Sequence, residues 1–164
     1  MIVLGIDPGS TVTAYGVVES KRGRLRYITS GHIRTTADTP IPIRLATIYE
    51  GLVKAIAAQP LDAISIEAIF THRSSESALR LGQARGVALL AAAQAGHIAH
   101  EYNAMTVKKT VAGSGRADKD AVARMVKMLL GVQPKGPKDI SDALAIAITH
   151  CQNANVRRAI EAIQ

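Results

Sequence analysis

Four acidic residues stand out among the thirteen in this 164-residue chain, because each lies in or beside an apolar segment. Asp7 ends the apolar run MIVLGI and precedes Pro-Gly, while Glu67 interrupts the stretch ISIEAIF. Asp139 and Asp142 are three residues apart in DISDALAIAI, a spacing that puts both side chains on one face of a helix. If the strands ending near Asp7 and Glu67 are parallel neighbours, these two carboxylates emerge at the same edge of a sheet, where α/β proteins commonly bind ligands.

Such a cluster of carboxylates requires protons or cations. Two carboxylates ~4 Å apart repel by about 4 kcal/mol at an effective dielectric constant near 20. Oxygen-only ligands favour Mg²⁺, with Mn²⁺ as a substitute. Two such ions would suit two-metal phosphodiester hydrolysis, in which one ion activates water and the other stabilises the leaving 3′ oxygen. The candidate catalytic residues and ligands of two Mg²⁺ ions are therefore Asp7, Glu67, Asp139 and Asp142.

Each acid, taken singly, also has a structural explanation. Asp7 could form an Asx turn with Pro-Gly. Asp139 could cap its helix, and Asp142 could interact with the helix dipole. Glu67 is harder to explain in this way, because a carboxylate buried by strand alternation needs a partner. Only the combination of the four favours a metal site.

Alternating and apolar segments predict the elements that position these acids. MIVLGI, TVTAYGVVES and RLRYITSGHIRT predict an antiparallel meander, and LDAISIEAIF and HIAHEY predict two later strands. Helices are expected over residues 42–58, 74–96, 104–112, 118–130 and 137–154. The result is an α/β fold in which a five-stranded mixed sheet, with three antiparallel strands and then parallel strands, is flanked by helices.

Two of these helices carry more specific expectations. The first should bury one face, made of Leu45, Ile48, Leu52, Val53 and Ile56. The second, with Ser74 or Ser75 as N-cap, is apolar on every face in its second half and should be covered on more than one side. We expect a single domain over residues 1–164, in which NVRRAIEAIQ is either an ordered helix or a flexible tail.

Composition indicates the kind of partner. The chain has 20 basic and 13 acidic residues, a formal net charge of +7 and a pI near 9.9. Setting the four candidate ligands aside leaves nine acids and a charge of +11, which favours a polyanion such as DNA. A lone cysteine, Cys151, excludes an internal disulfide and is typical of a reducing cytosol. Without an apolar run of ~18 residues or a secretion signal, we expect a cytoplasmic protein with no membrane contact.

Other chemistries have weaker support. No G-x-x-x-x-G-K-[ST] phosphate loop is present, and GSGRAD is too short for a dinucleotide fingerprint. His97 and His100 are three apart in an expected strand, so they face opposite sides and cannot readily share a zinc ion. No Ser-His-Asp or Cys-His set can be identified from spacing.

Four segments, in order and spacing, resemble the bacterial RuvC Holliday-junction resolvases: GIDPGS with YGVV, IEAIF followed by SALRLGQARGVALL, VKKTVAGSGRADK, and DISDALAIAITH. The similarity covers nearly the whole chain. It implies a ribonuclease-H-like fold, a homodimer, Mg²⁺-dependent paired nicking of four-way junctions in DNA recombination and repair, and cooperation with RuvA and RuvB. It assigns catalysis to Asp7, Glu67, Asp139 and Asp142. Ala14 and the segment FTHRSSES depart from the usual family pattern.

Several residues are expected to contact DNA. Phe70 follows Glu67 and could stack on bases or pack against the next helix, and the resemblance favours base contact. A basic helix-loop-helix contains GSGRADK, where glycines let phosphate approach the backbone, although a plain connector would look similar. Arg85 could extend the track or be structural. The expected DNA contacts are Phe70, Arg73, Arg80, Lys108, Lys109, Arg116 and Lys119, with Lys108 and Lys119 nearest the cut.

Paired cuts require two active sites, and helix 74–96 offers a two-fold surface because Gly82, Gly86 and several alanines permit close approach. Burial of this helix within one subunit is the alternative. Three other functions stay open: another ribonuclease-H-like nuclease, a junction-binding module without catalysis, and an actin-like nucleotide-binding protein. The last also has a GIDxGS hairpin, but it usually needs a second domain, for which this chain is too short.

Overall fold

The computed structural model of the protein describes residues 1–68 and 75–161. Its strands are β1 (Ile2–Asp7), β2 (Val12–Lys21), β3 (Arg24–Arg34), β4 (Ala63–Glu67) and β5 (His100–Tyr102). Its helices are α1 (Ile41–Ala57), α2 (Ser75–Gln94), α3 (Ala104–Ala112), α4 (Lys119–Leu130) and α5 (Asp139–Glu161).

The five strands form one sheet in the order β3-β2-β1-β4-β5. β1 pairs antiparallel with β2, and β2 with β3, whereas β4 is parallel to both β1 and β5. The predicted mixed sheet is therefore confirmed. β1 is central and covered on both faces, which is why its sequence is a continuous apolar run rather than an alternating one.

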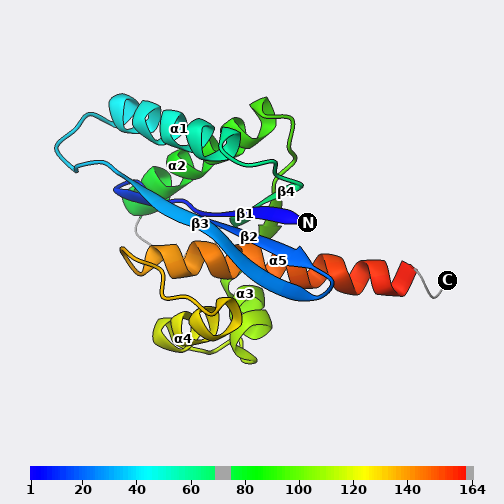
Figure 1. The fold of residues 1–164 in the computed structure, drawn as a ribbon. Helices are drawn as coiled ribbons and strands as arrows, with labels where there is room; N and C mark the ends of the chain where they lie inside the picture. The colour runs from blue at the N-terminus through cyan, green and yellow to red at the C-terminus, as the bar shows by residue number, and fades with distance from the viewer. Residues whose placement is uncertain (69–74, 162–164) are drawn as a thin grey trace.

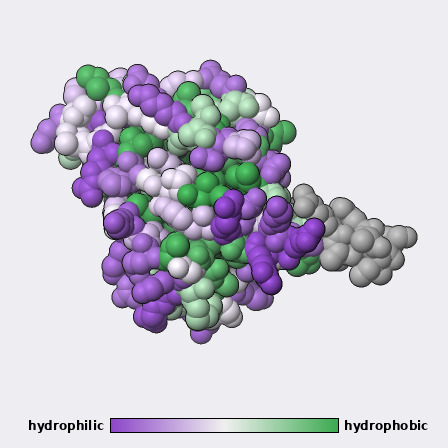
Figure 2. Space-filling model, viewed as in Figure 1, coloured by the Kyte–Doolittle hydropathy of each residue, from purple (hydrophilic) through white to green (hydrophobic). Residues whose placement is uncertain are grey.

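Helices cover the sheet on two sides (Figure 1): α1 and α2 lie on one face, and α5 lies on the other with α3 and α4 beyond it. Alternate β1 residues enter separate cores, Leu4 and Ile6 with α1 and α2, and Val3 with α5. On the face shown in Figure 2, hydrophobic residues appear between hydrophilic ones over both helical layers. In the described ranges, no helix is long and apolar enough to cross a membrane.

The structure corrects the predicted buried face of α1 and bears out the expectation for α2. Val53 is 38% exposed, and the buried face of α1 instead consists of Arg44, Ile48, Leu52, Ala55 and Ile56. Their spacing follows the helical repeat of 3.6 residues more closely than the predicted set did. The second half of α2 packs on more than one side, as predicted, because its buried Ala88, Ala91 and Ala92 share one core with α1, β1 and β4. Leu90 on its outer face is 51% exposed.

Some predicted boundaries also shift. β5 begins at His100 rather than His97, since Gly96 has a φ of +80° at the end of α2 and the next residues cross to the sheet edge. α5 begins at Asp139 and continues beyond Ala154 to Glu161, where the sequence contains no Pro or Gly to stop it. Ser74, one of the two expected N-caps, lies outside the described residues.

Candidate active site

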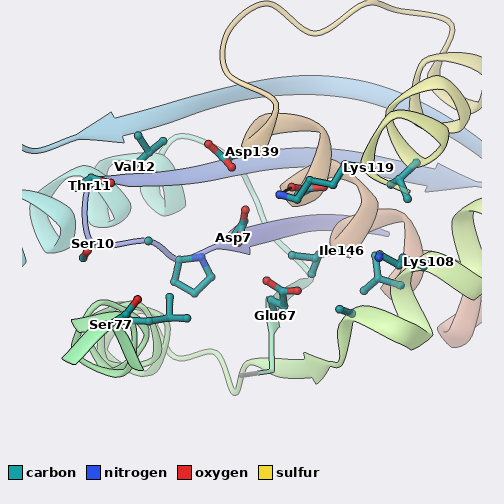
Figure 3. A pocket seen from close by; sticks show the side chains of 17 residues that line it. Asp7, Ser10, Thr11, Val12, Glu67, Ser77, Lys108, Lys119, Asp139 and Ile146 are labelled. Atoms are coloured by element: carbon teal, nitrogen blue, oxygen red, sulfur yellow. Dashed lines mark hydrogen bonds and ion pairs between the residues drawn. The ribbon is translucent and has the colours of Figure 1, made fainter. Parts of the chain in front are cut away.

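Strand pairing places Asp7 beside Glu67. β1 and β4 are parallel, with Ile6 opposite Ile66, so the next residue of each strand lies at the same edge of the sheet. Figure 3 shows both carboxylates in one pocket, and the pocket has a volume of about 500 Å³. The Asx turn, the alternative explanation for Asp7, is not present, because the Asp7 side chain makes no hydrogen bond to another described residue.

Close packing between α5 and β1 supplies the other two acids. A Cβ atom on Gly5 would lie 2.1 Å from the Ala143 carbonyl oxygen and 2.7 Å from the Ala147 nitrogen, so only glycine allows this approach. Asp142 precedes Ala143, and Asp139 is the first residue of α5. The glycine contact therefore brings the first turn of α5 against the end of β1.

Three of the four acids form a tight group. One carboxylate oxygen from each of Asp7, Asp139 and Asp142 lies within 4.8 Å of the others, and Glu67 lines the same pocket outside this group. Burial holds the pKa of Asp7 well above its ordinary value of 3.8, and Glu67, Asp142 and Asp139 raise it further by charge repulsion. A hard divalent cation would offset this repulsion, and all-carboxylate ligation suits Mg²⁺ or Mn²⁺. The residues present thus fit a metal site.

Lys119 provides a positive charge at this cluster. Its Nζ donates a hydrogen bond to Asp142 Oδ2 at 2.7 Å, and this contact, followed by the charges of Asp142, Asp7 and Asp139, raises the pKa of Lys119 against its partial burial. Lys119 is the first residue of α4, whose N-cap Asp118 accepts a hydrogen bond from the Ala121 N–H. Lys108 of α3 also lines the pocket. Both lysines predicted to lie nearest the cut therefore border the acids.

The other predicted DNA contacts are more dispersed. Lys109 and Arg116 are exposed and do not line the pocket. Arg80 is paired with Glu76 on the surface of α2. Arg85 forms an ion pair with Glu101 of β5, which supports a structural role. Phe70 and Arg73 lie outside the described residues.

Residues absent from the predicted set also border the site. Ser10 and Thr11 line the pocket next to Asp7, and Arg44 of α1, which is 2% exposed, donates hydrogen bonds to the Ser10 carbonyl. A sequence signal for Arg44 exists, because it lies four residues before Ile48 on the apolar stripe of α1. An arginine on such a stripe needs a buried polar partner.

Known proteins share this sequence and arrangement. The family model for crossover junction endodeoxyribonuclease RuvC matches residues 3–150. Curated RuvC proteins include one from Photorhabdus laumondii, 48% identical over 158 residues, covering 96% of this chain and 91% of that protein. Another, from Citrifermentans bemidjiense, is 44% identical over 156 residues and covers 95% of each chain.

Solved structures extend the comparison to the fold. T. thermophilus RuvC, in complex with Holliday junction substrate, matches with a TM-score of 0.89 at 35% identity, covering 95% of this chain and 96% of that one. The yeast mitochondrial Holliday junction resolvase has the same fold, with a TM-score of 0.66 at 16% identity and coverage of 99% and 86%. The chain therefore belongs to the RuvC family of crossover junction endodeoxyribonucleases.

Proposed function

We propose that this RuvC-family endonuclease resolves Holliday junctions by metal-dependent hydrolysis in the pocket formed by Asp7, Glu67, Asp139 and Asp142. The observation that supports this placement is the group of three carboxylate oxygens within 4.8 Å of one another, at the end of the central strand. Burial and the neighbouring acids raise the pKa of Asp7, and perturbed acids of this kind in a cleft are concentrated at functional sites.

Two Mg²⁺ ions per site, replaceable by Mn²⁺, are part of the proposal. Divalent ions held by these acids would supply an activated water and would neutralise charge on the phosphate. The chain itself positions the ligands through the contact between α5 and β1, and it limits solvent around Asp7 by burial. Lys108 and Lys119 border the acids and are proposed to bind phosphates of the cut strand.

The test is incubation with a mobile synthetic four-way junction and Mg²⁺, without ATP, beside a linear duplex of the same sequence. Paired symmetric nicks confined to the junction are expected. Equal cutting of both DNAs would indicate another ribonuclease-H-like nuclease. Tight binding without cutting, or ATP hydrolysis, would instead support the non-catalytic or the actin-like alternative.

Asp7→Asn tests the role of the pocket. It should abolish cutting while the protein still binds the junction, because it removes a proposed metal ligand and no proposed phosphate contact. Asp38→Asn is the matched control: Asp38 is exposed in the segment before α1, so this variant should cut like the wild type. Loss of both binding and cutting in Asp7→Asn would mean that Asp7 is structural.

We also propose that the protein acts as a homodimer through α2, which would supply two active sites for paired cuts. Leu79, Gly82, Gly86 and Leu90 follow one face of α2; both leucines are more than half exposed, and added Cβ atoms on the glycines would meet nothing within 4 Å. Leu90→Glu should yield monomers by sedimentation, whereas the control Ile43→Glu, on exposed α1 surface, should not. A wild type that stays monomeric at micromolar concentration would refute the dimer. Cooperation with RuvA and RuvB belongs to the same proposal and is testable by adding both to the junction assay.

A further inference from the structure

In the loop between β1 and β2, residues 8–11, the carbonyl groups of the last three residues accept hydrogen bonds from the body of the protein. The Gly9 carbonyl accepts a hydrogen bond from Thr13 Oγ1 at 2.8 Å. The Ser10 carbonyl accepts from Thr35 Oγ1 at 2.7 Å, from Arg44 Nε at 3.1 Å and from Arg44 Nη2. The Thr11 carbonyl accepts from the Thr35 N–H at 2.9 Å. Three successive carbonyls are thus turned toward Thr13 of β2, Thr35 just after β3, and Arg44 of α1.

The N–H groups of Ser10 and Thr11 point the other way, whereas the Gly9 N–H donates to Thr13 Oγ1 at 3.3 Å. In a planar trans peptide the N–H is directed opposite to the preceding carbonyl, so the Ser10 N–H points away from Thr13 and the Thr11 N–H away from Arg44. Within residues 1–68 and 75–161, neither N–H and neither hydroxyl of Ser10 and Thr11 has a hydrogen-bond partner. Successive free N–H groups in a turn form a concavity that binds anions.

Arg44 carries a buried positive charge that no carboxylate of the described residues neutralises. Its side chain is 2% exposed, yet it forms no ion pair with a carboxylate in the part of the chain that the structure describes. Its bonded partners are the Ser10 carbonyl and Thr35 Oγ1. A buried charge of this kind is unfavourable, and a hydrophobic side chain on the stripe with Ile48 would be better tolerated. Arg44 therefore fixes the loop and places positive charge directly behind it.

The loop and the two lysines lie on different sides of the acids. Figure 3 shows Ser10 and Thr11 at one end of the pocket and Lys108 and Lys119 at the other, with Asp7 and Glu67 between them. A DNA strand that crosses the acids would present a phosphate to each end. The lysines can bind one by charge, and the loop can bind the other through N–H and hydroxyl donors.

We propose that Ser10 and Thr11 bind a backbone phosphate of the cut strand, on the side of the scissile phosphate opposite the lysines, and that Arg44 is the positioning residue for this loop. The proposal rests on the proposed function, because the strand in question is the substrate of the same pocket.

The test combines protein variants with DNA in which single phosphates flanking the cut are replaced by neutral methylphosphonates. Binding to each junction is measured with Ca²⁺ in place of Mg²⁺, and gels check that the DNA stays uncut. The variants are Arg44→Met and, because the first could fold poorly, the loop variant Ser10→Ala/Thr11→Val. Lys54→Met is the matched control, since it removes an exposed positive charge from the same helix without contacting the loop.

For the wild type and Lys54→Met, we expect one methylphosphonate position to weaken binding about tenfold, the loss of one charge-assisted contact. In Arg44→Met and in the loop variant the same position should have a clearly smaller effect, while positions sensitive to Lys108 and Lys119 stay sensitive. In Arg44→Met, the slope of log K against log salt concentration should become less steep by about 0.7 to 0.9, the contribution of one phosphate contact. Arg44→Lys should restore part of both effects.

Two results would overturn the proposal. In the first, no methylphosphonate weakens binding of the wild type except at positions that depend on Lys108 and Lys119. In the second, the Arg44→Met and loop variants are folded and respond to each methylphosphonate as the wild type does. A purely structural Arg44 would give the second result, since loss of stability does not select one phosphate. If the wild type does not cut junctions in Mg²⁺, the proposed function itself fails. If it cuts normally but shows no coupling to the loop, only the phosphate site fails.

Discussion

Replacing Gly5 with alanine would move α5 without altering any candidate metal ligand. The new Cβ would lie 2.1 Å from the Ala143 carbonyl oxygen and 2.7 Å from the Ala147 nitrogen, and both atoms belong to the backbone, which cannot rotate away. To restore a normal contact, α5 must withdraw by about 1 Å, a strain that typically costs about 1 to 3 kcal/mol. Asp142 would move with Ala143, whereas Asp7 would stay at the end of β1.

This displacement should affect catalysis more than stability. A misplacement of about 1 Å in a catalytic group can lower the rate about 10²-fold. Gly5→Ala should therefore reduce the single-turnover rate of junction cleavage about 100-fold at saturating protein, at a temperature where denaturation shows that the variant is folded. Gly16→Ala should have a smaller effect, because its Cβ would meet side-chain atoms of Leu144 at 2.6 Å and a backbone atom, the Leu144 Cα, only at 3.2 Å.

Leu52→Ala separates the two effects. Leu52 is fully buried on the opposite face of the sheet, so its truncation should cost about 2 to 5 kcal/mol while leaving the acids in place. We expect this variant to be at least as destabilised as Gly5→Ala but to cut at nearly the wild-type rate while folded. Wild-type cleavage by Gly5→Ala, or an equal loss of rate in folded Leu52→Ala, would refute the positioning role of the β1–α5 contact.

Three further predictions concern the pH dependence of stability, the ion pair of Lys119 with Asp142, and the thiol of Cys151. The pKa of Asp7 in the folded protein lies above 3.8, so the folded state keeps the Asp7 proton at a pH where the unfolded state has lost it. The metal-free free energy of unfolding should therefore fall as pH rises from about 4 through that raised pKa, by at most about 1.4 kcal/mol per pH unit. Asp7→Asn should remove this fall in pH-dependent denaturation, and a variant with the wild-type slope would contradict the raised pKa of Asp7. Lys119→Met should lower metal-free stability and increase the rise in Tm on adding Mg²⁺, because it removes a cation that competes for Asp142; the control Lys108→Met should give a smaller change, and equal shifts would argue against competition. Cys151 is fully buried, and burial raises the pKa of its thiol to about 11, so iodoacetamide at pH 8 should label it only after unfolding; rapid labelling of the folded protein would contradict this burial.

Local sequence predicts α3 and α4 almost residue for residue. Asn103 and Asp118 cap these helices by accepting hydrogen bonds from the N–H groups of Thr106 and Ala121, and Gly113 and Gly131 end them. These signals act over a few residues, so they can be recognised without knowing the fold. The buried face of α1 is less predictable, because the loop that accepts hydrogen bonds from Arg44 is more than thirty residues away along the chain.

The sequence by itself determined the nature of the candidate site: oxygen ligands from four acids, on a basic chain, with Asp7 stopped at a strand end by Pro-Gly. Only the tertiary structure decided which acids form the tight group and that Lys119 pairs with Asp142. It also decided that the loop after Asp7 keeps two N–H groups without a partner among residues 1–68 and 75–161. The physical reason is that residue types fix chemistry locally, whereas distances depend on strand order and on backbone contacts such as Gly5 with Ala143. Those contacts join segments more than a hundred residues apart, and no local pattern specifies them.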